Sequence, residues 1–132
     1  MSKKLIMLLL ISSAAFADDR LNPDVTQETI MKTACVPSWT GTVRPSASYI
    51  NKLKKKQLPD TAKLSDYEED HIIPLALGGH PRNPVNLHPQ LWSGKCGAHE
   101  KDKDELRYHR LLCSGAITLE EAQSRFMPWE CE

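Results

Sequence analysis

The 132-residue chain lacks several features that would place it in a common class of proteins. Its four cysteines include no Cys-x-x-Cys pair, so a structural zinc cluster held by four thiolates is not expected. Its net charge is zero, so no overall field draws in a polyanion. It has no internal repeat and no low-complexity tract, and it is too short for two ordinary domains. These absences leave one small domain, whose function must be sought in local motifs.

The first residues have the layout of a secretory signal. Two lysines precede a short apolar run that begins at Leu5, and the segment ends on an Ala-x-Ala cleavage pattern at Ala17. This run is shorter than the roughly 20 residues that a membrane-spanning helix needs, and no later segment resembles a span. We therefore expect residues 1–17 to be removed on export, and residues 18–132 to form a single periplasmic or secreted domain without membrane attachment.

All four cysteines follow the expected signal. An even number of cysteines in an oxidising compartment favours two disulfides, and four cysteines allow three pairings. We favour Cys35 with Cys113, which would tie the early part of the domain to a later helix. The second bond would then join Cys96 to Cys131 and hold the C-terminal tail.

Apolar periodicity and capping residues predict four helices. They are expected over residues 22–32, 46–57 and 98–113, and from residue 118 onward. The first would be capped by Asp24 together with Gln27, the second by Ser46 or Ser48, and the last by a capping box that starts at Thr118.

Residues 35–45 contain two prolines and a glycine and should form an extended loop anchored by Trp39. The chain has two further tryptophans, Trp92 and Trp129. All three could stack on nucleic-acid bases, although in so small a domain tryptophans more often anchor a core or a loop.

Between the helices, the pattern predicts a short β-hairpin. Residues 67–77 are rich in Ile and Leu and precede Gly78-Gly79, which can supply a tight reversal. Pro74 removes a backbone donor, so the first strand must be short, at an edge or broken there. Residues 85–88 would return as the second strand, closed by Pro89. The expected fold class is therefore α+β, a short hairpin surrounded by helices and stabilised by disulfides.

The hairpin carries groups suited to phosphodiester hydrolysis. Near neutral pH, the imidazole of His71 can accept a proton from water. Asp70 offers a hard oxygen ligand for Mg²⁺, with His99 on the following helix as the candidate second ligand. Neighbouring strand residues point to opposite sides, so a bend or strand end is needed for Asp70 and His71 to share one site. Asn86 is expected to fix the loop with its amide and so to orient His71.

A basic segment lies just before these residues and could contact phosphates, although a lysine-rich helix face is often simply solvated. Its members that we assign to nucleic-acid binding are Arg44, Lys52, Lys54, Lys55 and Lys56.

Asp70-His71, Asn86-Leu87 and a polar position on the next helix resemble the HNH nucleases, whose ββα-metal fold is a hairpin and a helix around one divalent ion. The wider chain is similar to small exported bacterial HNH proteins, for example in Tyr67-Glu-Glu-Asp-His71 and Leu112-Cys-Ser-Gly115. The similar part runs from about Cys35 to Gln123.

The resemblance implies metal-dependent cleavage of nucleic acid, with DNA as the expected substrate and weak sequence preference. It implies His71 as the general base, Asp70 as a metal ligand and Asn86 as the loop-fixing residue. Mg²⁺ is the expected ion, and Mn²⁺, Ni²⁺ or Zn²⁺ are alternatives. The third HNH position departs in spacing, so His99 is assigned by its chemistry, with Glu100 or Asp102 as alternatives.

Two other interpretations remain open from the sequence. The first is a non-catalytic exported module that binds nucleic acid or another partner and keeps the HNH scaffold. The second is a domain in which His71, His88 and His99 bind zinc only for folding.

Overall fold

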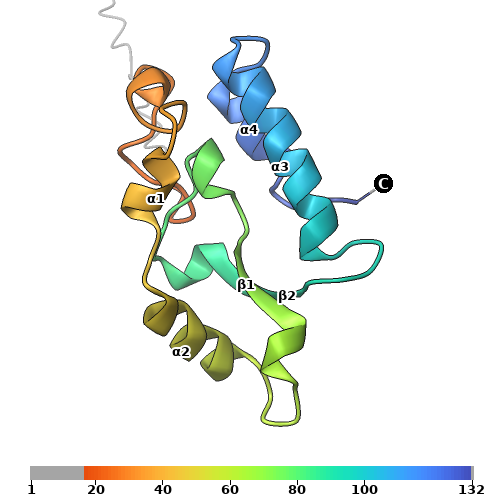
Figure 1. The fold of residues 1–132 in the computed structure, drawn as a ribbon. Coiled ribbons are helices and arrows are strands. Elements are labelled where there is room, and N and C mark those ends of the chain that lie inside the picture. The colour runs from red at the N-terminus through yellow and green to blue at the C-terminus, as the bar shows by residue number, and fades with distance from the viewer. Residues whose placement is uncertain (1–16, 132) are drawn as a thin grey trace, which may run out of the picture.

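The computed structural model describes residues 17–131, so the expected signal peptide lies outside the described residues apart from Ala17. The described chain is a mixed α+β structure with one two-stranded antiparallel sheet (Figure 1). Its helices and strands are α1 (Trp39–Val43), α2 (Ala47–Gln57), β1 (Tyr67–His71), β2 (Leu87–Leu91), α3 (Ala98–Cys113) and α4 (Leu119–Ser124). None of the helices in this part of the chain is long and apolar enough to cross a membrane.

The strands form a hairpin with a long connection. Tyr67 is opposite Leu91 and His71 is opposite Leu87. The first strand is shorter than the predicted 67–77 and ends at His71, before the break expected at Pro74.

The reversal between the strands is also longer than predicted. It spans residues 72–86 and contains two 3-10 turns, and Gly78 adopts a φ of 81° at the end of the first of them. The second strand begins at residue 87 and not at 85, and it continues through Pro89 instead of ending there. A two-stranded sheet has only edge strands, and an edge strand tolerates a proline.

Two of the predicted helices flank this hairpin. The side chain of Ser46 caps α2 by accepting a hydrogen bond from the Tyr49 N–H. Gln57 of α2 donates to Leu87 O at 3.1 Å and so attaches the helix to β2. On the other side of the hairpin, α3 spans the predicted residues and packs beside α4 (Figure 1).

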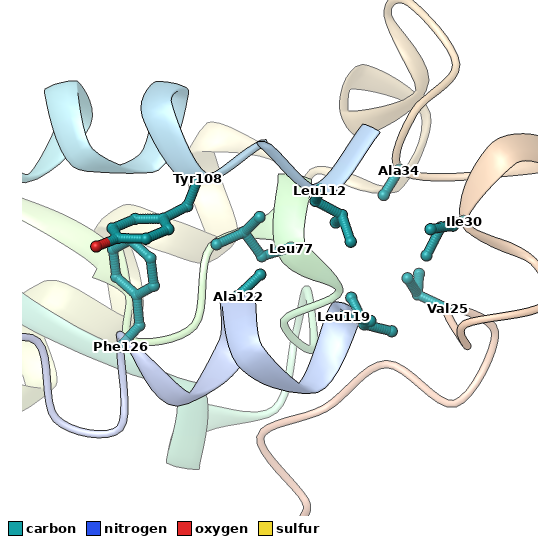
Figure 2. Close-up of a cluster of buried hydrophobic side chains, with 9 residues drawn as sticks. All are labelled: Val25, Ile30, Ala34, Leu77, Tyr108, Leu112, Leu119, Ala122 and Phe126. Carbon is teal, nitrogen blue, oxygen red and sulfur yellow. The ribbon is translucent and has the colours of Figure 1, made fainter. Parts of the chain in front are cut away.

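The hydrophobic core lies away from the hairpin, where α3 and α4 meet the N-terminal segment and the loop residue Leu77 (Figure 2). The predicted capping box of Thr118 and Glu121 begins α4. The rings of Tyr108 and Phe126 pack edge to face, with centroids 5.9 Å apart. The core cluster comprises Val25, Ile30, Ala34, Leu77, Tyr108, Leu112, Leu119, Ala122 and Phe126.

The prediction of a first helix over residues 22–32 is wrong. Only Ile30–Lys32 forms a 3-10 turn, and Asp24 does not cap a helix. Local side chains satisfy the backbone instead: Asn22 Oδ1 accepts from the Asp24 N–H, and Thr29 Oγ1 accepts from the Thr26 N–H. Such bonds compete with the helical pattern.

The predicted loop 35–45 contains the short helix α1, which begins at Trp39. Trp39 packs against the core, as expected of an anchor.

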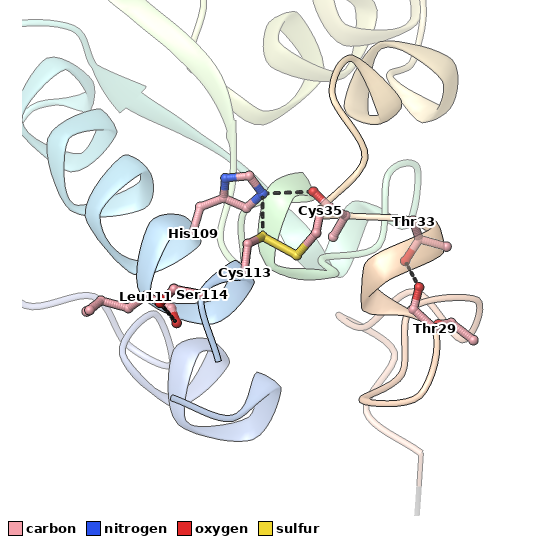
Figure 3. Close-up of a disulfide and its surroundings, with 8 residues drawn as sticks. Thr29, Thr33, Cys35, His109, Leu111, Cys113 and Ser114 are labelled. Carbon is pink, nitrogen blue, oxygen red and sulfur yellow. Dashed lines mark hydrogen bonds between the residues drawn. A yellow bond between two sulfur atoms is a disulfide. The ribbon is translucent and has the colours of Figure 1, made fainter. Parts of the chain in front are cut away.

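The described chain forms two disulfides, Cys35–Cys113 and Cys96–Cys131, in the pairing favoured from the sequence. The first joins the N-terminal segment to the end of α3, next to His109 (Figure 3). There, His109 Nε2 donates to Ala34 O at 2.8 Å.

Candidate functional site

His71 lies at the end of β1 with its ring held by a carbonyl group of the loop. Its Nε2 is 2.9 Å from Pro81 O, and the residue is only 7% exposed. A carbonyl oxygen can only accept a hydrogen bond, so Nε2 carries the proton of the neutral ring and Nδ1 keeps a free lone pair. Burial lowers the pKa of His71 below its usual value, which keeps the imidazole neutral near pH 7.

The loop that carries Pro81 is held in place by Asn86, which is completely buried. Its Oδ1 accepts from the Ile73 N–H at 2.9 Å, and its Nδ2 donates to Ile73 O at 3.1 Å and to His80 O at 3.0 Å. At Gly79 the loop packs so closely that a Cβ atom would lie 1.7 Å from Ile73 O. These are the contacts expected of a loop-fixing asparagine.

Asp70 is in contact with Lys101 of α3, a residue that the sequence reasoning missed. Lys101 is 2% exposed, and its ammonium group donates to Asp70 Oδ2 and, at 2.6 Å, to His71 O. Burial alone would raise the pKa of Asp70, but His88 and Lys101 outweigh it and hold this pKa below its usual value. A signal was present in the sequence, because Lys101 shares the inward face of the helix with Ala98, three residues earlier.

A cleft of about 190 Å³ opens beside these residues. Asp70 and His71 both line it, so the strand end at His71 allows the two neighbours to share one site. Most of its polar groups are carboxylates from β1 and α3. The charged and titratable residues around it include Arg44, Glu68, Asp70, His71, Asp102 and Glu105.

Unlike Asp70, the other carboxyl groups of the cleft have raised pKa values. Burial, followed by the charges of Asp70 and Asp102, raises the pKa of Glu68 to about 7. Burial also raises the pKa of Glu105 to about 8, although Lys101 opposes it, and burial raises the pKa of Asp102.

The donor set of the cleft fits a divalent cation. Within residues 17–131, Glu68 Oε2 is buried and has no hydrogen-bond partner. Crowded carboxylates with an unpaired buried oxygen suit a hard ion such as Mg²⁺, which favours their ionised form. Glu68, Asp70 and Asp102 are the residues that would hold it. Their ligand atoms do not form a group of three within 4.8 Å, so side-chain rotation would accompany binding.

The three residues considered as the second ligand lie in different surroundings. Asp102 lines the cleft. Glu100 is exposed, and its carboxylate is 2.9 Å from Lys103 Nζ. His99 is also exposed, and its ring lies against Trp92 with centroids 5.3 Å apart. The structure therefore brings Asp102, and not the predicted His99, to the cleft of Asp70. The reason is that α3 begins at Ala98, and the residues one turn later face the hairpin.

The predicted basic residues lie in three different surroundings. Arg44 lines the cleft and forms no ion pair within the described part of the chain. Lys54 is half-buried and donates to Tyr67 O at 3.0 Å, so it also attaches α2 to β1. The remaining members are exposed on α2: Lys52, Lys55 and Lys56.

One set of three metal-ligand side chains converges within 4.8 Å in residues 17–131, namely Cys35, His109 and Cys113. The two cysteines are joined in a disulfide, so they offer no thiolate to a metal ion (Figure 3). His71, His88 and His99 do not form such a set either: His71 is buried and donates to Pro81 O, whereas His99 is exposed and lies against Trp92, so the described residues give no support to a zinc-stabilised domain built on them.

No protein-family model, curated protein or solved structure matches this chain. The function is therefore inferred from the geometry of its own residues.

Proposed function

We propose that this protein is a metal-dependent endonuclease that hydrolyses phosphodiester bonds, with His71 as the general base. The observation that carries the proposal is the orientation of His71. Its Nε2–H donates to Pro81 O, so Nδ1, with its lone pair, is the basic atom of the ring. A neutral, oriented imidazole beside a carboxylate-lined cleft is the arrangement needed to take a proton from an attacking water.

The remaining residues have complementary roles. Asn86 keeps the loop and its Pro81 carbonyl in position and thereby orients the base. Glu68, Asp70 and Asp102 would bind one divalent cation, with Mg²⁺ as the first candidate, and this ion would supply positive charge to the phosphate and to the leaving oxygen. Arg44 lines the same cleft and would contact a phosphate oxygen.

The resemblance to HNH nucleases supports the same conclusion. The Asp-His pair at the end of β1, the loop asparagine and the helix that packs against the hairpin have the order of a ββα-metal motif. We propose DNA as the substrate with weak sequence preference, because no element of the sequence is evidently suited to reading base edges. The two disulfides agree with an exported protein, since such bonds persist in oxidising compartments.

One observation favours a second candidate, a binding module without catalysis. Lys101 already neutralises Asp70, and its buried ammonium could replace the cation that an active enzyme requires. The unpaired oxygen of Glu68 argues against this alternative, because the lysine leaves that carboxylate unsatisfied.

The two candidates are separated by incubating the oxidised protein with supercoiled plasmid and Mg²⁺ or Mn²⁺. We expect nicked and linear products that disappear when a chelator is added. Retention of DNA without any cleavage would support the binding module. No cleavage of DNA or RNA with any divalent ion would overturn the proposed enzyme.

A further inference from the structure

The three tryptophans have different surroundings. Trp39 and Trp129 pack against the hydrophobic core, and Trp129 Nε1 also donates to Asp104 Oδ2 at 3.0 Å. Trp92, which directly follows β2, is half-buried and does not pack against that core. Its indole N–H has no hydrogen-bond partner within residues 17–131. Two tryptophans therefore act as anchors, and the third has no such role.

Trp92 lines a groove of about 310 Å³ between α2 and the hairpin. The apolar wall of the groove comes from Pro45, Ala47 and Ile50, and its other walls carry the Asn51 amide. The groove shares four residues with the smaller cleft of the candidate site: Arg44, Glu68, Glu69 and His71. A ligand held in the groove would therefore lie next to the proposed general base.

The size and chemistry of the groove suit one nucleoside unit. Its volume is at the lower end of the roughly 300–1,000 Å³ found for small-ligand pockets. An aromatic face, aliphatic walls and an amide match the flat faces and polar edges of a nucleobase. Arg44 and Lys54 lie at the same groove, so positive charge is available for the attached phosphates.

His99 restricts the indole ring on one side. The imidazole of His99 lies against it with an interplanar angle of 32°, and the His99 N–H donates to Trp92 O at 3.2 Å. An aromatic ring restricted in this way loses little conformational entropy when a base stacks on it. In this structure His99 contacts Trp92 and does not line the cleft of Asp70.

We propose that this groove binds one unstacked nucleobase on Trp92, beside the phosphodiester served by His71, so that the protein prefers single-stranded or locally unpaired nucleic acid. The inference rests on the proposed function and specifies its substrate. A base inside a duplex is covered on both faces by its neighbours and must leave the stack to reach such a groove, which costs a few kcal/mol. Stacking accepts every base, which agrees with weak sequence preference.

The test uses binding alone, in the presence of a chelator and with His71→Ala protein so that no cleavage occurs. The probes are a labelled oligothymidine of about 12 nucleotides and a duplex of the same length. Trp92→Leu should weaken binding of the single strand by roughly 5- to 150-fold, the range for loss of one stacked base, and should change duplex binding less than about twofold. Trp92→Phe should retain most of the affinity. Leu91→Ala, at the exposed neighbouring position, is the matched control.

Equal losses for single strand and duplex, or unchanged single-strand binding in Trp92→Leu, would overturn the inference. A second measurement needs no change at Trp92. Oligothymidine should quench the tryptophan emission of the His71→Ala protein, and unchanged emission at saturation would also overturn it. If Trp92 stacks bases but the unmutated protein cleaves no nucleic acid, the proposed function is wrong and the assignment of the groove to a nucleobase is retained. If that protein cleaves and Trp92→Leu binds normally, only the groove assignment fails.

Discussion

The two ends of the molecule bury different chemistry. The core end encloses apolar side chains such as Leu77, Leu112 and Phe126 and is closed by the disulfide Cys35–Cys113. The hairpin end buries charged and polar groups, among them Asp70, His71, Asn86 and Lys101. Apolar burial contributes about 25 cal/mol per Å², whereas burial of a charge costs free energy unless the charge is paired. The core end therefore supplies stability to a hairpin end whose buried charges the proposed function would explain.

The largest effect is expected from the ion pair at the hairpin end. Lys101→Met should lower the free energy of unfolding by about 3–5 kcal/mol, because it leaves the buried carboxylate of Asp70 without its partner. Urea denaturation measures the loss. Lys103→Met, on the exposed face of α3, is the control and should change stability by less than about 0.5 kcal/mol. If the double variant Asp70→Asn with Lys101→Met regains stability, the cost lies in the unpaired carboxylate of Asp70. Equal stability of Lys101→Met and Lys103→Met would refute the prediction.

A comparison of Asn86→Ala with Leu112→Ala should distinguish a loss of stability from a loss of activity. Asn86→Ala removes three buried hydrogen bonds and should cost about 3 kcal/mol, comparable to the roughly 2–5 kcal/mol expected for Leu112→Ala in the core. The nuclease activity per folded molecule should fall in Asn86→Ala, because His71 loses its orientation. It should be unchanged in Leu112→Ala. Calorimetry together with a cleavage assay tests this. Equal activity of the two folded variants would remove Asn86 from the site.

The metal ligand on α3 is tested by two isosteric changes. Asp102→Asn should raise the Mg²⁺ or Mn²⁺ concentration that gives half-maximal binding by about 10- to 100-fold, because one anionic oxygen donor is lost from the cleft. Glu100→Gln, exposed and paired with Lys103, should leave this concentration unchanged. Isothermal titration with Mn²⁺ reports both. A reversed order of effects would make Glu100, and not Asp102, the metal ligand on α3.

The smallest effect is a pH dependence of stability. In the unfolded chain the carboxyls of Glu68, Glu69 and Glu105 ionise near their ordinary pKa of 4.5, but in the folded state their pKa values are about 7, about 7 and about 8. Between these values the folded state binds more protons, so stability falls as pH rises from about 4.5 through about 8 and levels off above the folded pKa values. His71 has a lowered pKa and is mostly neutral in both states above about pH 7.

In a chelating buffer, the Tm should therefore be lower at about pH 8.5 than at about pH 7. Added Mg²⁺ should reduce the difference because the ion binds the ionised carboxylates. Glu105→Gln should also reduce it, since this residue has the most raised pKa of the three. A Tm that rises with pH in the chelated protein would show that the carboxyls of the cleft are not protonated as described.

The sequence predicted those parts of the fold that depend on local signals. Ser46 and Thr118 cap helices where expected, and Ser114-Gly115 follows the end of α3. The prediction of a helix over residues 22–32 failed because hydroxyl and amide side chains, such as those of Asn22 and Thr29, form hydrogen bonds with nearby backbone groups in place of helical partners.

The candidate site was predictable only in part, because its contacts join residues far apart in the sequence. Asp70, His71 and Asn86 could be selected from their types and spacing. The ion pair from Lys101 to Asp70 spans 31 residues, and lysine is seldom buried, so its position on the helix face of Ala98 was not enough to identify it. To choose Asp102 over His99, one must know at which residue α3 begins and which of its faces meets the hairpin.

The proposed mechanism depends on His71 as the general base. This role is tested by the single-turnover rate of plasmid cleavage by the oxidised protein at saturating Mg²⁺ or Mn²⁺, measured for wild type, His71→Ala and the exposed control Glu120→Gln. We predict that His71→Ala cleaves about 10²- to 10⁴-fold more slowly while Glu120→Gln matches wild type. Equal rates for wild type and His71→Ala, with both proteins folded, would show that His71 is not the general base.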